Sequence, residues 1–219
     1  MTNIDWKNLP FGYFKTDYNV RCYYRNGKWG EVEVSSSEYI TMHMAATCLH
    51  YGQEAFEGMK AFRGSDGKIR VFRWMENAKR MQRSAEGIMM AVPPVELFGE
   101  MIFKAIKLNE KYVPPYGYGA SLYLRPLLIG TGAEVGVKPA DEYLFMVFVG
   151  PVGPYFKEGF KILEEKRGFF ALDQEQLIME PDLRRLNIFH TLITILALMA
   201  NCTQHTVKIY PSAIKRHES

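Results

Sequence analysis

The sequence has few cysteines, and neither sign of charge dominates it. Its three cysteines, Cys22, Cys48 and Cys202, lie far apart and form no CxxC pair. An odd, scattered set of this kind excludes a disulfide framework and a cysteine-based metal site, and it indicates thiols in a reducing cytoplasm. Lys and Arg together number 27 and Asp and Glu 24, so the net charge is only +3. With no long run of like charge, the chain gives no reason to expect a nucleic-acid partner.

Motifs for secretion, membrane insertion and several enzyme classes are also missing. Residues 1–12 contain no apolar stretch of the signal-peptide kind. Residues 187–207 carry no Asp, Glu, Lys or Arg, but His190 and several threonines make this segment a poor membrane span. The chain has no G-x-S-x-G elbow and no P-loop. We therefore expect a cytoplasmic protein with no membrane role.

The first 150 residues alternate strand and helix patterns. Asn26-Gly27 and Asp66-Gly67 each lie between partly alternating runs, which predicts two β-hairpins. Apolar periodicity predicts a helix over residues 75–86 and a second helix that Pro93-Pro94 opens and Pro114-Pro115 ends. Hairpins among helices indicate an α+β domain rather than a parallel doubly wound sheet.

Two further segments have the pattern of strands. Residues 142–150 form a near-continuous apolar run, which indicates a strand buried on both faces. Over residues 120–130, leucines alternate with Tyr123 and Arg125, so these two side chains are expected to share the opposite face. Pro126 has no N–H to donate, and the strand is therefore expected to lie at an edge or to be distorted there.

Tyr123 and Arg125 are the clearest candidate for a binding site. A guanidinium binds a carboxylate through two parallel hydrogen bonds, and a strand holds it rigidly. The alternative is an arginine that extends into solvent from an edge strand. Arg80, on the first predicted helix, is similarly open to two interpretations, because it either holds a phosphate or belongs to a solvated helix face.

Two other patterns are weaker. Gly130, Gly132 and Gly136 have the spacing GxGxxxG, with a proline soon after, so the dinucleotide-binding fingerprint is not met and a turn-rich loop is expected. His43 and His50 are seven residues apart, a spacing that would place them on one helix face. No further ligand completes a metal set around them, so we expect core or interface histidines and no metal site.

Residues 50–63, HYGQEAFEGMKAFR, fit neither a helical nor a strand period. Two aromatics, two glycines and two glutamates stand close together there. Something other than burial is therefore expected to shape this segment.

Three stretches taken together resemble the branched-chain amino-acid aminotransferases. They are HYGQEAFEGMKAFR, VFRWMENAKRMQRSAEGIMM and SLYLRPLLIGTGAEVGVKPADEYLFMVFVGPVGPYF, in family order and at family-like spacing from about residue 5 to about residue 160. The resemblance implies a homodimeric pyridoxal-phosphate enzyme of the D-amino-acid-aminotransferase-like fold. Its substrates would be leucine, isoleucine or valine with 2-oxoglutarate. Residues 1–150 would be the small domain, 151–160 a connector and 161–219 a divergent or truncated C-terminal segment.

The resemblance also implies roles for individual residues. Arg80 would bind the cofactor phosphate, and Gly58 would let the backbone pass closely. Tyr123 and Arg125 would lie near the substrate carboxylate. The residues implied for the substrate site are Tyr51, Phe56, Tyr123, Arg125, Val137 and Tyr155, some of them reaching the neighbouring subunit. The irregular segment 50–63 would then shape a cavity instead of filling a core.

The C-terminal part of the chain departs from the family. The family's Schiff-base lysine lies in a G-x-x-K-x-G-G-N-Y stretch that this sequence lacks; Arg184 and Arg185 stand near the expected position, and residues 167–207 contain no lysine. The chain is therefore expected to be inactive as it stands, with residues 161–219 too few to form the family's large domain and mostly helical, poorly packed or disordered. The alternatives are a non-catalytic binding or dimerisation module derived from the small domain, and an enzyme that uses another lysine.

Overall fold

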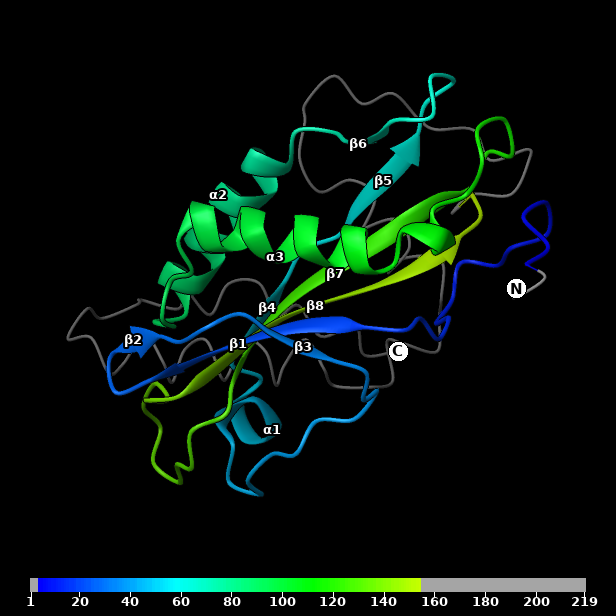
Figure 1. Ribbon diagram of the computed structural model, residues 1–219. Helices are drawn as coiled ribbons and strands as arrows, with labels where there is room; N and C mark the ends of the chain where they lie inside the picture. Colours follow the sequence, from blue (N-terminus) through cyan, green and yellow to red (C-terminus); the bar gives the residue numbers. More distant parts are fainter. Residues whose placement is uncertain (1–3, 155–219) are drawn as a thin grey trace, which may run out of the picture. The chain divides into compact units, whose positions relative to one another are not determined.

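One eight-stranded sheet forms the framework of the fold, with α2 and α3 on one side and α1 on the other (Figure 1). The computed structural model describes residues 4–154. The strands are β1 (Asn19–Arg25), β2 (Lys28–Trp29), β3 (Glu33–Ser35), β4 (Glu54–Phe56), β5 (Met59–Arg63), β6 (Ile69–Val71), β7 (Ser121–Gly130) and β8 (Tyr143–Val152). The helices are α1 (Thr47–Tyr51), α2 (Trp74–Gly87) and α3 (Val95–Leu108), with a 3-10 turn η1 (Glu110–Tyr112).

The strand order is β2-β1-β8-β7-β5-β6, with β3 also paired to β1 and β4 to β7. Every pairing between these strands is antiparallel. The described residues therefore have the α+β architecture that the sequence predicts. Of the three domain ranges expected from the sequence, the structure describes only residues up to 154, and β8 continues to Val152, two residues into the predicted connector.

Both predicted hairpins are present. Asn26 and Gly27 connect β1 to β2 with φ values of 52° and 75°, and positive φ at both central residues is what a type I′ turn requires. Gly67 connects β5 to β6 with φ 75°, and its N–H donates to the carbonyl of Gly64 at 2.9 Å.

The two predicted helices are also present, although the second ends earlier than expected. The helix α3 begins directly after Pro94 but stops at Leu108, before the proline pair that the sequence suggested as its end. Asn109 accounts for the early stop. Its buried side chain donates to the carbonyls of Ala105 and Tyr18, both at 2.9 Å, so it satisfies a carbonyl of the last helical turn and ties the helix to the segment before β1.

The main core lies between α2, α3 and one face of the sheet. Leu122, Leu124 and Phe145 contribute fully buried side chains from the sheet, and Phe98 and Met101 contribute theirs from α3. Leu144 and Met146 of β8 pack into a smaller cluster that also contains Ile129 of β7. Successive residues of β8 thus belong to different clusters, which confirms the predicted burial of this strand on both faces.

Pro126 does not mark an edge strand, so the first of the two expectations for it is wrong. The strand β7 is central, with β8 on one side and β4 and β5 on the other. The distortion falls on the partner strand, because β4 ends at Phe56 and β5 begins at Met59. Glu57 lies in this gap and donates its N–H to the carbonyl of Pro126 at 2.9 Å, whereas Pro126 has no N–H to return.

No helix among residues 4–154 has the length and apolar character needed to cross a membrane.

Replacement of Phe98 should reveal how far the domain depends on its helix-to-sheet core. Phe98 is 1% exposed and stacks on Phe145 with ring centroids 5.8 Å apart, so Phe98→Ala should lower the free energy of unfolding by about 3–5 kcal/mol. Urea unfolding followed by tryptophan fluorescence measures this, since all three tryptophans lie within residues 4–154.

Phe103 on the same helix is the matched control. It is 47% exposed and makes an edge-to-face contact with Trp74, so Phe103→Ala should cost less than about 1.5 kcal/mol. Equal losses for the two variants would contradict the assignment of the core to the sheet-facing side of α3.

Candidate functional site

In the segment that follows α1, buried residues alternate with residues that are exposed or partly exposed, so the expectation that residues 50–63 follow no period is wrong for its strand part. The chain leaves α1 through Gly52, whose φ of 59° suits a glycine. From Gln53 to Ala61, every odd-numbered residue is buried. The period was hidden because the hydropathy is partly reversed: Gln53 and Glu57 are buried, while Phe56 is 59% exposed. Such a reversal indicates that both faces of the strand serve contacts other than simple core packing.

The outward face of this strand meets the outward face of β7 in a cluster around Arg125. The guanidinium of Arg125 lies over the ring of Phe56 at 4.5 Å and beside the ring of Tyr123 at 5.4 Å. Its Nε donates to the hydroxyl of Tyr123 at 3.0 Å. The prediction that Tyr123 and Arg125 share one strand face is therefore confirmed, and the structure adds Phe56 from the neighbouring strand. Arg125 is neither on an edge strand nor extended freely into solvent.

Gly58 determines how closely Tyr123 can approach this strand. A Cβ atom at Gly58 would lie 2.6 Å from the hydroxyl oxygen of Tyr123, closer than van der Waals contact allows. On its other side, the ring of Tyr123 meets Phe11 edge to face, with centroids 5.3 Å apart. Among the described residues, the close approach at Gly58 is therefore made by a side chain, the ring of Tyr123.

The inward face presents Glu57 to α2, where it binds Arg80. Nε of Arg80 donates to Oε1 of Glu57 at 2.7 Å, and Nη2 donates to Oε2 at 2.5 Å. Nδ2 of Asn77 donates to the same Oε2 at 2.8 Å. The hydrogen bond to Glu57 raises the pKa of Arg80 above its ordinary value. The Arg80 side chain is 47% exposed and that of Glu57 only 4%, so Arg80 is more than part of a solvated helix face.

Sequence reasoning missed Glu57 and Asn77 as site residues. A glutamate between an aromatic residue and a glycine gives no signal of burial by itself. The signal that could have found it is the alternation across Gln53–Ala61, which places Glu57 on the same face as Ala55 and Met59.

The buried residue Gln53 forms hydrogen bonds to four different parts of the domain. Its side-chain oxygen accepts hydrogen bonds from the hydroxyl of Thr47 at 2.8 Å and from the N–H of Ala140 at 3.1 Å, and its Nε2 donates to the carbonyl of Ile88 at 3.2 Å. Its backbone carbonyl accepts from the N–H of Gly130 at 3.0 Å. A buried amide with all of these partners fixes α1 relative to the end of β7, the end of α2 and the loop before β8.

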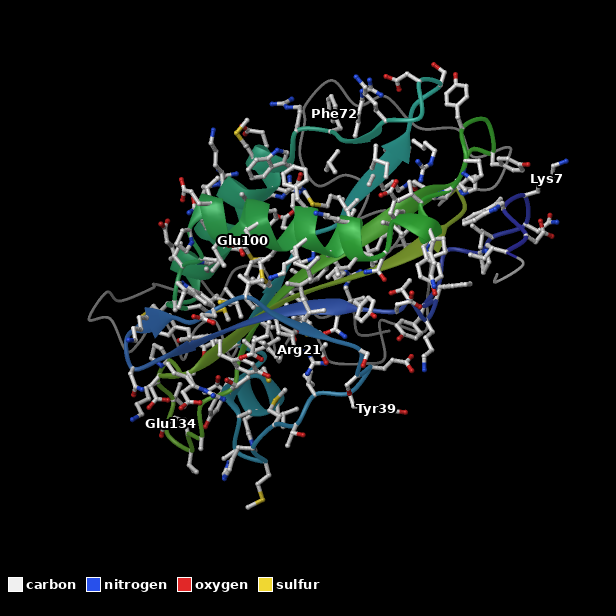
Figure 2. The ribbon with its side chains drawn as sticks, in the orientation of Figure 1. Lys7, Arg21, Tyr39, Phe72, Glu100 and Glu134 are labelled. Carbon is white, nitrogen blue, oxygen red and sulfur yellow. The ribbon has the colours of Figure 1, made fainter. Side chains whose placement is uncertain are left out.

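The loop after β7 carries Val137, and Tyr51 holds it from α1. The hydroxyl of Tyr51 donates to the carbonyl of Val135. Glu134, labelled in Figure 2, accepts from two backbone N–H groups of the loop and pairs with Lys138 at 2.6 Å. The hydrogen bond from Lys138 is the largest cause that lowers the pKa of Glu134. Tyr51 and Val137, which is 41% exposed, thus form a second group of candidate residues.

The remaining candidates divide between those the structure explains and those outside the described residues. His50 lies in α1, but His43 precedes that helix, so the expected common helix face is wrong. No group of three potential metal ligands occurs among residues 4–154. Gly130 ends β7, and a Cβ there would collide with Thr47 and Gln53, so it has a packing role. Tyr155, the 161–219 segment with its expected helices, and the position of the family's lysine all lie outside the described residues.

The fold is shared with a solved aminotransferase. The T.th. branched-chain amino acid aminotransferase, solved with pyridoxamine 5′-phosphate, matches with a TM-score of 0.50 and 25% sequence identity, over 67% of this chain and 43% of that chain. The described domain therefore has the architecture of part of a branched-chain aminotransferase.

Curated relatives show which proteins the N-terminal part of the chain is similar to. The branched-chain-amino-acid aminotransferase of Haemophilus influenzae is 48% identical over 159 residues, which are 73% of this chain and 46% of that protein. The Helicobacter pylori enzyme is 50% identical over 159 residues, or 73% of this chain and 47% of its own length. No protein-family model matches the chain. The chain spans about half the length of these curated relatives, and its N-terminal part is homologous to the branched-chain aminotransferases, which confirms the resemblance.

Replacement of Gly58 should disturb the Arg125 cluster without unfolding the domain. In Gly58→Ala the new methyl group would lie 2.6 Å from the hydroxyl oxygen of Tyr123, so the ring should move and the hydrogen bond from Nε of Arg125 should be lost. Because the half-buried ring can turn aside, the stability loss should stay at or below the lower end of overpacking costs, about 1 kcal/mol. Nitrogen-15 NMR of the arginine Nε–H groups checks this directly.

Gly12→Ala is the control, since a Cβ at Gly12 meets no atom within 4 Å. An unchanged Arg125 Nε–H resonance in Gly58→Ala would contradict the close packing of Gly58 and Tyr123.

Proposed function

We propose that the N-terminal part of this chain is the small domain of a branched-chain aminotransferase. In this proposal it carries one half of a site for a phosphate-bearing cofactor and an amino-acid substrate. The observation that carries the proposal is the cluster of Arg125, Tyr123 and Phe56, which combines a carboxylate-binding cation with aromatic surface. The homology to branched-chain aminotransferases supports the same function.

The proposed cofactor is pyridoxal 5′-phosphate, and the donor set of Arg80 fits its phosphate group. A guanidinium has N–H donors on Nε, Nη1 and Nη2, and Glu57 occupies Nε and one position on Nη2. The half-exposed side chain keeps its Nη1 group for an anion from outside. When bound, the cofactor supplies the carbonyl carbon that accepts the amino group and the ring that withdraws electrons from the substrate Cα.

The Arg125 cluster would orient the substrate. The guanidinium binds the α-carboxylate, and the hydroxyl of Tyr123 fixes the guanidinium through Nε. Phe56, with 59% of its surface exposed, offers an apolar wall for the side chain of leucine, isoleucine or valine. The same carboxylate site would serve 2-oxoglutarate, the proposed amino acceptor.

Tyr51 and Val137 would complete the pocket wall, together with Tyr155 beyond the described residues. Their separate grouping around the loop after β7 is compatible with service to the site of a second subunit, so the proposal includes a homodimer. A cytoplasmic location, with no nucleic-acid or membrane partner, remains part of the same proposal.

The chain is proposed to bind these ligands without completing turnover. Transfer of the amino group needs a base that moves the Cα proton, and the family's lysine motif is absent from the sequence. The second candidate is a non-catalytic binding or dimerisation module. The exposed outward face around Phe56 favours it, because such a face can contact another protein as well as a substrate.

Pyridoxamine 5′-phosphate binding by the purified full chain tests the cofactor half of the proposal. This probe has no aldehyde and so does not react with surface lysines. Arg80→Ala should weaken its binding about tenfold or more, the loss expected for a hydrogen bond to a charged group, while Arg83→Ala, an exposed arginine on the same helix, should leave it unchanged. Calorimetric titration measures both. Equal affinity in Arg80→Ala and the wild type would remove Arg80 from the phosphate site.

An activity assay tests the second part of the proposal, that the chain does not complete turnover. The chain with pyridoxal phosphate should give no leucine:2-oxoglutarate transamination above the rate of the free cofactor. Borohydride reduction and peptide mapping would identify any lysine that has replaced the missing one; on the described sheet, register places Lys60 opposite Tyr123. Turnover that disappears when such a mapped lysine is changed to alanine would contradict the proposed inactivity.

A further inference from the structure

The burial of Glu57 demands partners, and the structure supplies them from one helix. A buried carboxylate is costly unless it is paired and hydrogen-bonded. Glu57 is 4% exposed and accepts from Nε and Nη2 of Arg80 and from Nδ2 of Asn77. Asn77 also reaches the carbonyl of Gly58 at 3.4 Å. The carboxylate is therefore held in one orientation by two residues of α2.

Glu57 is also fixed from the sheet side. Its N–H donates to the carbonyl of Pro126 at 2.9 Å, and Pro126 directly follows Arg125. A continuous path of covalent bonds and hydrogen bonds thus runs from Arg125 through Pro126 and Glu57 to Arg80. This path fixes the orientation of Arg80 relative to β7, the strand that carries the proposed carboxylate site.

The pairing leaves a defined edge of Arg80 available. Glu57 contacts the Nε–Nη2 edge, and Nη1 donates no hydrogen bond to any acceptor within residues 4–154. A free arginine side chain samples many rotamers and loses this freedom when it binds an anion. Arg80 has already lost most of it to Glu57.

We propose that Glu57 is a positioning residue that presents the Nη1 edge of Arg80 to the phosphate monoester of the ligand. This inference rests on the proposed phosphate role of Arg80 and deepens it. An effect of Glu57 through orientation and an effect through charge predict opposite changes in ligand affinity when Glu57 is removed. If Glu57 acted only through its charge, its removal would leave Arg80 more attractive to a dianion and binding would tighten. If Glu57 orients Arg80, its removal weakens binding.

The decisive measurement is the affinity of the full chain for pyridoxamine 5′-phosphate in Glu57→Gln. Glutamine keeps the size of the side chain but loses the two-oxygen acceptor for the guanidinium. Binding should become about three- to tenfold weaker, the range expected when a rotamer-rich side chain must be ordered by the ligand. Unphosphorylated pyridoxamine should show no difference between Glu57→Gln and the wild type, because the effect acts on the phosphate.

Glu76→Gln is the matched control. It also removes one negative charge near Arg80, but from an exposed residue of α2 that lies one turn before Arg80 and pairs with Lys79. Its affinity for the probe should stay within about twofold of the wild type. Equal or tighter binding by Glu57→Gln would overturn the proposal.

Two further readouts separate orientation from general destabilisation. The Nε–H resonance of Arg80 should exchange slowly with water in the wild type and in Glu76→Gln but rapidly in Glu57→Gln. Asn77→Ala, which removes one of three hydrogen bonds to the carboxylate and keeps the ion pair, should weaken probe binding in the same direction by a smaller factor. If Glu57→Gln does not fold, as judged by tryptophan fluorescence, Asn77→Ala decides the question, and unchanged affinity there overturns the proposal.

The same titrations distinguish a failed inference from a failed function. Loss of binding in Arg80→Ala with none in Glu57→Gln removes only the positioning role. Wild-type affinity in Arg80→Ala, or no saturable binding of the probe by the wild type, removes the phosphate site and the inference with it.

Discussion

Glu57 and Gly58 lie where the pairing between β7 and its neighbour is interrupted. The contact of Glu57 with Arg80 and the contact of Gly58 with Tyr123 both depend on this position. The strands β4 and β5 pair with β7 in one register on either side of the interruption, so residues 54–63 run as a single strand with a gap opposite Arg125 and Pro126. Pro126 accepts from the N–H of Glu57 but has no N–H to return. Because the strand alternation continues through the gap, Gly58 faces the Arg125 side while Glu57 faces α2. One short segment thus contributes to both faces of the sheet.

Such a segment departs from the usual rule that the buried face of a strand is apolar. The domain compensates through partners. Gln53 and Glu57 are each surrounded by donors or acceptors, and no buried side-chain nitrogen or oxygen among residues 4–154 lacks a hydrogen-bond partner. On the outward side, Phe56 is exposed but covered in part by the guanidinium of Arg125. Polar groups that are buried and fully partnered fix positions more strictly than apolar packing does, which is the property that a binding site requires.

Local signals in the sequence were sufficient for much of the fold. The positive φ angles at Asn26 and Gly27 and the shared face of Tyr123 and Arg125 follow from turn chemistry and strand alternation, which need no knowledge of distant residues. The bond between Glu57 and Arg80 joins residues that are 23 positions apart on two different elements, and no local pattern encodes it. The end of α3 was misplaced for the same reason, because Asn109 is fixed by Tyr18 from a segment 91 positions away. Pro126 was open to two interpretations because a missing N–H is tolerated wherever the partner strand is interrupted, and only the sheet order reveals which strand that is.

The proposed site would bind its ligands through two arginines, and binding alone does not accelerate a reaction. In the proposed roles, Arg80 and Arg125 would hold phosphate and carboxylate groups equally well before and during a chemical step, since neither anion changes its charge when a proton leaves the substrate Cα. Interactions that are equal in the ground state and the transition state lower the concentration of ligand needed but leave the barrier unchanged. The rate must come from a group that changes its protonation state beside the reacting carbon, which is the part that the family assigns to its lysine. The orientation of Arg80 by Glu57 would therefore contribute mainly by fixing the position of the ligand. A ligand held in this way would have a defined position relative to the group, on this chain or another, that carries the proton.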